Sequence, residues 1–220
     1  MSTLAEDFYL RKEWRPDAIS YSLADMWYRN PAGFRAKYYW GKPSYSNPAF
    51  EYGSIISDMI KNDPENPLLN NVIKYPMRDE EYWTDISGVP FVFHPDTFHP
   101  DTFSFREYKT TTFDIKHNKL PWDDKKVKRH IQLDCYSLGI ETLFGKVNNV
   151  CHLDCLIKEK KQLTDQEKSL SAMTGKEPPP ALFTGQVITF ERNITDLERY
   201  RAKEWLLQAF YEIKNDYEKK

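Results

Sequence analysis

Apolar positions show helical spacing in the first quarter of the chain, before any strand spacing appears. Residues 23–28 follow Ser20, a residue type that caps helices, and a second helical piece over residues 34–40 follows the break at Asn30-Pro31. In residues 49–61 the apolar side chains fall on one helical face. This part of the chain predicts two short helices and one longer helix.

Strand spacing begins at residues 88–94 and returns in residues 102–110, where apolar and polar positions alternate. The segment 99–101 between them is a turn signal, so the two strands are expected to form a hairpin. Because side chains alternate across a strand, Glu107 and Lys109 share one face of the second strand. Burying both charges unpaired would be costly, so this strand is expected to end in a polar cleft.

The second half of the chain predicts a helix over residues 123–144 that stops at Gly145. Gln132 and Tyr136 are four residues apart, so they lie one above the other on a flank of this helix. Further strands are expected near residues 147–158 and 185–192.

A polar stretch that ends in Pro178-Pro179-Pro180 separates those two strands and is expected to be a surface loop. Thr195 or Asp196 then caps a long amphipathic helix, which we expect to pack on the sheet. A chain of this length is long enough for one ordinary α/β domain.

Composition and charge narrow the function classes. A chain of 220 residues favours one domain, and its net charge of -2 and pI of about 6.2 mean that any nucleic-acid contact must come from local clusters. Three cysteines do not make a disulfide framework, no signal peptide is evident, and no run reaches the length of a membrane span. We therefore expect a soluble cytoplasmic protein without membrane partners.

Candidate chemistry gathers on the predicted hairpin. Asp96 belongs to its first arm, eleven residues before Glu107, and two converging carboxylates would repel unless a cation joined them. Mg²⁺ or Mn²⁺ suits oxygen ligands of this kind. A phosphodiester hydrolase also needs a positive side chain to steady the transition state, and Lys109 provides one.

Several motifs in order resemble the PD-(D/E)XK nucleases, in particular their RecB-like and RecE-like, phage-type exonuclease branch. Pro95-Asp96 and the segment 107–110 resemble the signature aspartate and the E-x-K tripeptide, and residues 132–136 resemble the Q-x-x-x-Y motif. The segment 50–57 is similar to the first-helix motif. The resemblance covers about residues 20 to 145.

The resemblance implies an α/β, restriction-endonuclease-like core, with a mixed central β-sheet flanked by helices and an N-terminal helical segment. It implies a single nuclease domain over residues 1–220, with a helical and aromatic segment at 1–47, the core motifs at 48–145, and further strands and the C-terminal helix at 146–220. The activity it implies is metal-dependent hydrolysis of DNA, most often as an exonuclease. The implied catalytic residues are Asp96, Glu107, Lys109, Gln132 and Tyr136, and the implied metal ligands are Asp96, Glu107, the Tyr108 carbonyl and Glu51.

The sequence departs from the family pattern at Ser57, which stands where many relatives have a metal-binding His. The site could be completed by Glu51, Asp58 or water, or the chain could be a catalytically lapsed relative that binds DNA or a protein. The repeat of His-Pro-Asp-Thr-Phe also offers two aspartates, Asp96 and Asp101, and we favour Asp96 because Asp101 falls in the predicted turn.

The most basic stretch of the chain leads into the Q-x-x-x-Y helix and is a candidate DNA contact. It contains Lys116, His117, Lys119, Lys125, Lys126, Lys128, Arg129 and His130. Four aromatic residues, Trp27, Tyr38, Tyr39 and Trp40, are candidates for stacking on bases, although such residues more often belong to a core.

The spacing of Cys135, Cys151 and Cys155 does not match the four-cysteine iron–sulfur cluster of some RecB-like nucleases, so no cluster is expected. The partners implied by the resemblance are linear DNA ends, a second copy of the chain and a recombination protein. RNA as a substrate is left open.

Overall fold

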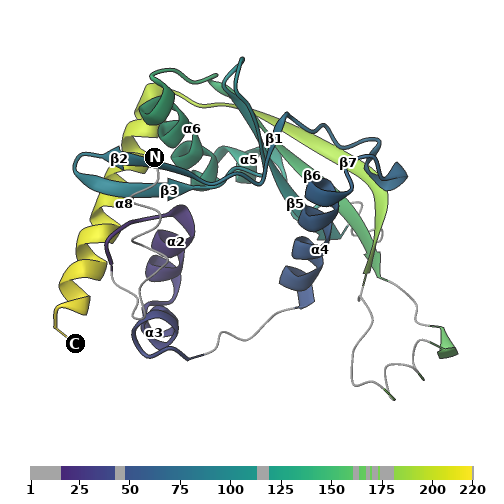
Figure 1. Ribbon diagram of the computed structural model, residues 1–220, viewed down its shortest axis with the longest axis horizontal. Coiled ribbons are helices and arrows are strands. Elements are labelled where there is room, and N and C mark those ends of the chain that lie inside the picture. Colours follow the sequence, from purple (N-terminus) through teal and green to yellow (C-terminus); the bar gives the residue numbers. More distant parts are fainter. Residues whose placement is uncertain are drawn as a thin grey trace.

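The computed structural model describes residues 16–42, 48–112, 119–160, 164–166, 169, 173 and 181–219, without the side chains of residues 48–52, 160, 181 and 182. The helices before the first strand, shown in Figure 1, are α2 (Tyr21–Arg29), α3 (Pro31–Phe34), the π-helix η1 (Arg35–Tyr39), α4 (Pro48–Asn62) and the 3-10 helix η2 (Pro67–Leu69). The strands are β1 (Met77–Arg78), β2 (Tyr82–Ile86), β3 (Val89–Phe93), β4 (Thr97–His99), β5 (Ser104–Thr112), β6 (Val150–Lys160) and β7 (Ala181–Asn193). The later helices are α5 (Asp124–Lys128), α6 (Ile131–Phe144) and α8 (Asp196–Tyr217).

Within the described residues, five strands form a mixed sheet in the order β1-β4-β5-β6-β7. Strands β5 and β6 are parallel, and the other neighbours are antiparallel. A crossover containing α5 and α6 joins the parallel pair, as parallel strands require. Strands β2 and β3 form a separate hairpin.

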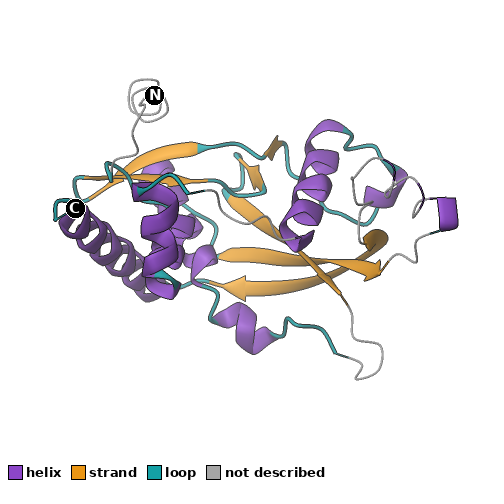
Figure 2. Cartoon of the chain, turned by 90° about the horizontal axis from the view of Figure 1, so that it is seen from below, coloured by secondary structure: helices purple, strands orange, loops and turns teal. Residues whose placement is uncertain are grey.

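Helices cover both faces of the sheet (Figure 1, Figure 2). On one face, α6 packs with α8 and the β2–β3 hairpin, and α2 packs against α8. Phe105, Leu133 and Leu153 belong to the core on this face. On the other face, α4 and η2 close a smaller core that contains Ile56 and Leu156. Strand β6 therefore sends Leu153 to one core and Leu156 to the other, so it carries apolar residues on both faces.

The predicted hairpin was wrong in its first arm. The antiparallel neighbour of β5 is the short β4, with Thr97 opposite Arg106, whereas β3 pairs with β2. The chain leaves β3 at residues 94–96, where a proline lacks the N–H that a continuing ladder would need. Asp96 consequently lies in the link between β3 and β4.

Neither strand β2 nor the turn that follows it was predicted from the sequence. Ile86 pairs with Val89 across the two-residue loop Ser87-Gly88, and both loop residues have positive φ, 56° and 85°. Such a loop is the type I′ turn that joins twisted antiparallel strands.

The helix predicted over residues 123–144 is two helices, because α5 ends at Lys128 and α6 begins at Ile131. Gly145 terminates α6 in the left-handed conformation, at φ 72°, as predicted. Thr195 caps α8 through a capping box with Glu198. That helix packs mainly against α6 and α2, so the expectation that it packs on the sheet was wrong.

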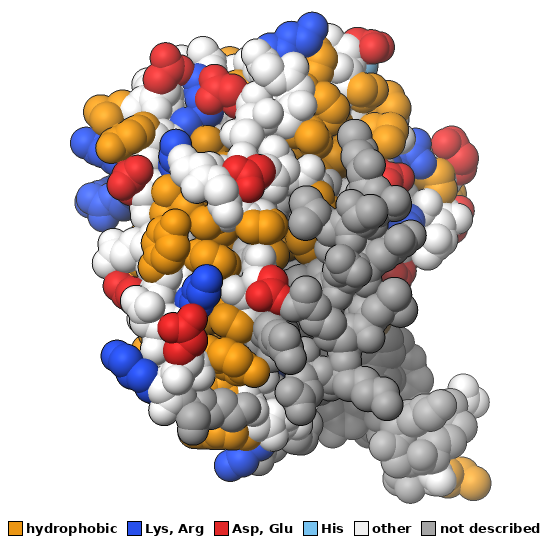
Figure 3. All heavy atoms as spheres, turned by 60° about the vertical axis from the view of Figure 1, so that its left-hand side comes forward, with side chains coloured by type: hydrophobic (Ala, Val, Ile, Leu, Met, Phe, Trp, Pro, Cys, Tyr) orange, Lys and Arg blue, Asp and Glu red, His pale blue; other side chains and the backbone are white. Residues whose placement is uncertain are grey.

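Figure 3 turns the α8 side of the molecule forward. Basic and acidic side chains are intermixed there with apolar ones, so the described part of this face carries no basic stripe. In the described residues, no helix combines the length and the apolar character needed to cross a membrane. The predicted surface loop up to Pro180 falls mostly outside the described residues.

Candidate active site

Strand β5 carries the E-x-K residues from the core toward the surface. Along one face Phe105 is fully buried, Glu107 is 3% exposed and Lys109 is partly exposed. Toward the opposite face, Arg106 donates two hydrogen bonds to the Asp154 carboxylate of β6, at 2.6 and 2.8 Å. The predicted alternation is confirmed, and the charged end of the face lies where the strand leaves the core.

A hydrogen-bonded network joins β5 to α6. Lys109 Nζ donates to Glu107 Oε1 at 2.5 Å and to Gln132 Oε1 at 2.9 Å. The Gln132 amide nitrogen donates to the same Glu107 oxygen and to the Tyr136 hydroxyl, both at 2.8 Å. Burial would lower the pKa of Lys109, but the Glu107 and Asp96 carboxylates raise it above its usual value. The structure thus brings these four predicted residues together and keeps Lys109 charged.

Asp96 joins the set from the link before β4. Its Oδ2 accepts a hydrogen bond from the backbone N–H of Tyr108 at 2.6 Å, beyond the point where β4 stops pairing with β5. Burial and the nearby Glu107 carboxylate raise the pKa of Asp96 well above its usual value. Asp101 is exposed in the turn between β4 and β5. Of the two aspartates, Asp96 is therefore the one beside Glu107.

One oxygen of Glu107 has no partner in the described residues. Oε1 accepts from Lys109 and Gln132, whereas Oε2 is buried without a hydrogen bond. An unpaired buried carboxylate oxygen is costly, and Asp96 adds a second acidic group next to it. These residues fit a hard divalent cation, because Mg²⁺ binds one or two carboxylates and keeps several waters.

The described residues contain no cluster of three or more His, Cys, Asp or Glu side chains that could hold a metal. A cation at Asp96 and Glu107 would therefore need backbone oxygen or water to complete its shell. The carbonyl of Tyr108 stays a predicted ligand. The side chain of Glu51, the further predicted ligand, lies outside the described part of α4.

His130 was placed by the sequence in the basic stretch, but it belongs to the site. Its Nε2 lies 3.1 Å from Gln132 Oε1, and its ring packs edge-on against Tyr21 and Trp122. Burial lowers the pKa of His130 to about 3, so the ring is neutral. Because Gln132 Oε1 is an acceptor, the His130 Nε2–H must donate, and this bond helps to fix the orientation of the amide.

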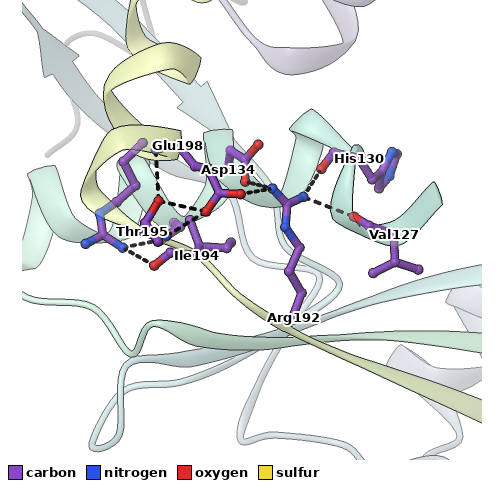
Figure 4. Close-up of polar contacts among 9 residues, drawn as sticks. Val127, His130, Asp134, Arg192, Ile194, Thr195 and Glu198 are labelled. Carbon is purple, nitrogen blue, oxygen red and sulfur yellow. Dashed lines mark hydrogen bonds and ion pairs between the residues drawn. The ribbon is translucent and has the colours of Figure 1, made fainter. Parts of the chain in front are cut away.

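Arg192 of β7 holds the break between α5 and α6 in place (Figure 4). Its guanidinium donates to the carbonyl oxygens of Val127 and His130 at 3.1 and 2.9 Å, and to the Asp134 carboxylate at 2.5 Å. The last carbonyls of a helix lack hydrogen-bond partners within the helix, and Arg192 donates to one of them, the Val127 carbonyl of α5. Arg192 therefore positions the start of α6, from which Gln132 reaches the site. No local pattern of residues predicted this long-range contact.

On the α4 side of β5, Ser57 lies with Asp96 and Tyr108 around a small cavity of about 10 Å³. A larger cavity of about 570 Å³ runs beside it, lined in part by Ser57, Asp58 and Lys109. Ser57, which the motif resemblance aligns with a metal-binding His, thus lines the same cavity as Asp96 from α4. Asp58 is exposed beside the larger cavity, so completion by Asp58 or by water stays open.

The basic residues predicted to contact DNA, Lys125, Lys126, Lys128 and Arg129, are all exposed on α5 and at its end. Lys126 Nζ lies 4.3 Å from the centre of the Trp122 ring. The α5 segment runs directly into His130 and Gln132, so these cations border the candidate site. Lys116 and His117, at the start of the basic stretch, lie outside the described residues.

The three cysteines are buried free thiols, Cys135 on α6 and Cys151 and Cys155 on β6. Burial raises the pKa of Cys151 and of Cys155 to about 12, which disfavours thiolate chemistry.

The four aromatic candidates for base stacking separate into different environments. Trp27 and Tyr39 are buried in the core, and Trp40 is 57% exposed. Tyr38 is partly exposed and lines a cavity that reaches Lys109.

No family model matches the chain, and no curated protein matches its sequence. Its structure resembles that of a proposed exonuclease from Eubacterium rectale, with a TM-score of 0.55 and 12% identity, over 99% of this chain and 88% of that one. The chain has the fold of that protein. The predicted fold class, a mixed sheet flanked by helices with an N-terminal helical segment, is thereby confirmed. The resemblance stated from the motifs is confirmed at the level of the fold.

Two further solved structures match more loosely. One is a phage-related exonuclease from Haemophilus somnus 129PT, with a TM-score of 0.47 and 10% identity over 83% of this chain and 77% of that one. The other is an alkaline exonuclease from Laribacter hongkongensis, with a TM-score of 0.48 and 14% identity over 93% and 91%.

Proposed function

We propose that the chain is a divalent-metal-dependent DNA nuclease that hydrolyses phosphodiester bonds from linear ends. The observation that carries the proposal is the network of Lys109, Glu107, Gln132 and Tyr136 beside Asp96, with Glu107 Oε2 left unpaired. Two neighbouring carboxylates and a charged lysine supply metal binding and transition-state stabilisation at one place.

Asp96 and Glu107 would hold the metal, with the Tyr108 carbonyl and water as further ligands and Glu51 as a candidate. When bound, Mg²⁺ or Mn²⁺ polarises a phosphoryl oxygen and lowers the pKa of an attacking water. No Fe–S cluster enters this proposal.

The protein's own groups act around that centre. Lys109 places a positive charge where the phosphate would become more negative, and Glu107 and Gln132 keep the ammonium in position. Gln132 links Lys109 to Tyr136, so movement of the amide would disturb both. The exposed cations of α5, Lys125, Lys126, Lys128 and Arg129, would bind the phosphates of the strand that leads to the site.

The test is hydrolysis of end-labelled linear DNA and of covalently closed circular DNA, each with Mg²⁺, Mn²⁺ or a chelator. The wild type is expected to degrade the linear substrate in a metal-dependent manner, and Lys109→Ala is expected to lose at least about 100-fold in rate. The matched control is Lys214→Ala, which removes an exposed lysine from α8. Absence of metal-dependent cleavage by the wild type would refute the proposal, and cleavage of circles would make the enzyme an endonuclease.

A second candidate is a lapsed nuclease that binds DNA or a partner protein without cutting, and Ser57 at the position of the family His favours it. It predicts that the wild type retains linear DNA in a gel-shift assay while the hydrolysis assay shows no product. We also propose that the protein acts in DNA end processing or recombination. Its association with a recombination protein, its assembly as a homo-oligomer and its cytoplasmic location stay predictions. RNA is tested by exchanging the substrate in the same assay.

A further inference from the structure

A cavity of about 460 Å³ opens beside the network, on the side of the N-terminal helices. The first turn of α2, η1 and β3 contribute to its wall, and Lys109, Gln132 and Tyr136 of the network line it as well. Its volume falls in the range of about 300–1,000 Å³ that is usual for small-ligand sites. The site thus continues into a cavity large enough for part of a nucleotide.

The chemistry of the wall is mainly aromatic and aliphatic, through Tyr21, Leu23, Tyr38, Val92 and Phe93. A flat, uncharged ring system is the ligand that such a wall favours, because every base has a face that stacks on aromatic side chains.

Few of the described residues that line the cavity are charged. Among them Lys109 is the sole lysine or arginine, and it is held by Glu107 at 2.5 Å, while Glu81 adds an acidic group. A phosphate is therefore favoured at Lys109 and disfavoured elsewhere along the lining. The distribution suits a nucleotide whose phosphate lies at Lys109 and whose base lies against the apolar wall.

Tyr38 is the candidate stacking residue. It belongs to the π-helix η1, a type of element frequent at functional sites, and its ring packs against Phe34 with 4.7 Å between the ring centres. The Tyr38 ring remains partly exposed at the cavity, whereas Phe93 is buried. Trp40, two residues after Tyr38, is more exposed but does not line the cavity.

We propose, on the basis of the proposed function, that this cavity is a nucleobase subsite, in which Tyr38 stacks on the base of the nucleotide whose phosphate is bound at Lys109. The subsite selects for the presence of a base, because stacking on an aromatic ring is open to every base.

The experiment is an abasic scan with linear DNA. Single abasic residues replace the terminal, second or third nucleotide of an end-labelled strand, and kcat/KM is measured for the wild type, Tyr38→Ala and the matched control Tyr200→Ala, which removes an exposed tyrosine from α8. For the wild type, one abasic position is expected to lower kcat/KM about tenfold. In Tyr38→Ala, intact DNA is expected to be cut about tenfold more slowly, and the abasic residue at that position should cause no further loss. Tyr200→Ala should behave as the wild type.

Two further variants guard against a folding defect. Tyr38→Phe keeps the ring and should keep the dependence on the base, and Val92→Phe narrows the cavity and should raise KM for intact DNA. Equal cleavage of all abasic substrates by the wild type would overturn the subsite, as would a full abasic penalty in a folded Tyr38→Ala. Failure of the proposed function looks different, because the wild type would then not cut intact DNA at all.

Discussion

Replacement of Arg192 by Met removes the contact that holds α5, α6 and β7 together. The arginine is 5% exposed and donates to two main-chain carbonyls and to the Asp134 carboxylate. Met keeps much of the side-chain length but cannot donate. The variant therefore leaves Asp134, itself 8% exposed, without its cation.

The expected loss of folding free energy is about 3–5 kcal/mol, the usual cost of removing one partner from a buried ion pair. The unsatisfied carbonyls of Val127 and His130 act in the same direction. For a chain of this size the loss corresponds to a fall in Tm of roughly 10 °C. It is large against a total stability of about 5–15 kcal/mol.

The loss should depend on pH. Burial raises the pKa of Asp134 from 3.8 to about 6 in the folded chain, although Arg192 opposes that rise. A folded-state pKa above the unfolded value adds stability at low pH, and this contribution disappears as the pH rises through about 6. Without Arg192 the pKa of Asp134 rises further, so Arg192→Met should be more destabilising at pH 8 than at pH 5.

Urea denaturation followed by circular dichroism at both pH values measures the effect. The double variant Arg192→Met/Asp134→Asn is the control, since removal of the second charge should recover at least half of the loss at pH 8. A loss below about 1 kcal/mol at pH 8, or one that does not shrink at pH 5, would show that the ion pair does not carry the stability assigned to it.

Three smaller perturbations test separate parts of the account. His130→Phe keeps an aromatic ring but removes the N–H that donates to Gln132, so kcat/KM should fall about fivefold with little change in Tm. An unchanged kcat/KM would contradict the positioning role of His130. Gly139→Ala places a Cβ 2.6 Å from Phe93 Cδ1, and urea denaturation should show a loss of about 1–3 kcal/mol, whereas no loss would mean that the ring moves freely. Thr195→Ala removes the cap of α8 and should cost about 1 kcal/mol by thermal melting; Thr195→Ser, which keeps a capping hydroxyl, should cost much less.

The spacing of apolar and polar residues predicted the features that depend on a regular period within one helix or strand. Glu107 and Lys109 share a face because side chains repeat every two residues along a strand. Gln132 and Tyr136 lie side by side because residues four apart are neighbours on a helix. Both were correct because they depend on one element at a time. The break after Lys128 was missed, since Arg192, more than sixty residues away, supplies the partner for the Val127 carbonyl.

Pairing between strands was harder to predict. Asp96 was expected on the long arm of a hairpin, yet it reaches Glu107 from a link, because β3 leaves the sheet for a separate hairpin with β2. The proximity of the two carboxylates was nonetheless predicted, since the short β4 follows Asp96 directly and pairs with β5. The position of His130 beside Gln132 depends on the break between α5 and α6, which was missed. Residue spacing therefore did not predict that His130 belongs to the site.

The most direct test of a metal-dependent nuclease is the initial rate of nucleotide release from linear duplex DNA, measured as a function of Mn²⁺ concentration for the wild type and Glu107→Gln. The account predicts no release in chelator, a saturable rise with Mn²⁺ for the wild type, and a rate at least about 100-fold lower for the variant at every concentration. Equal rates for the two proteins, or release by the wild type without metal, would contradict it.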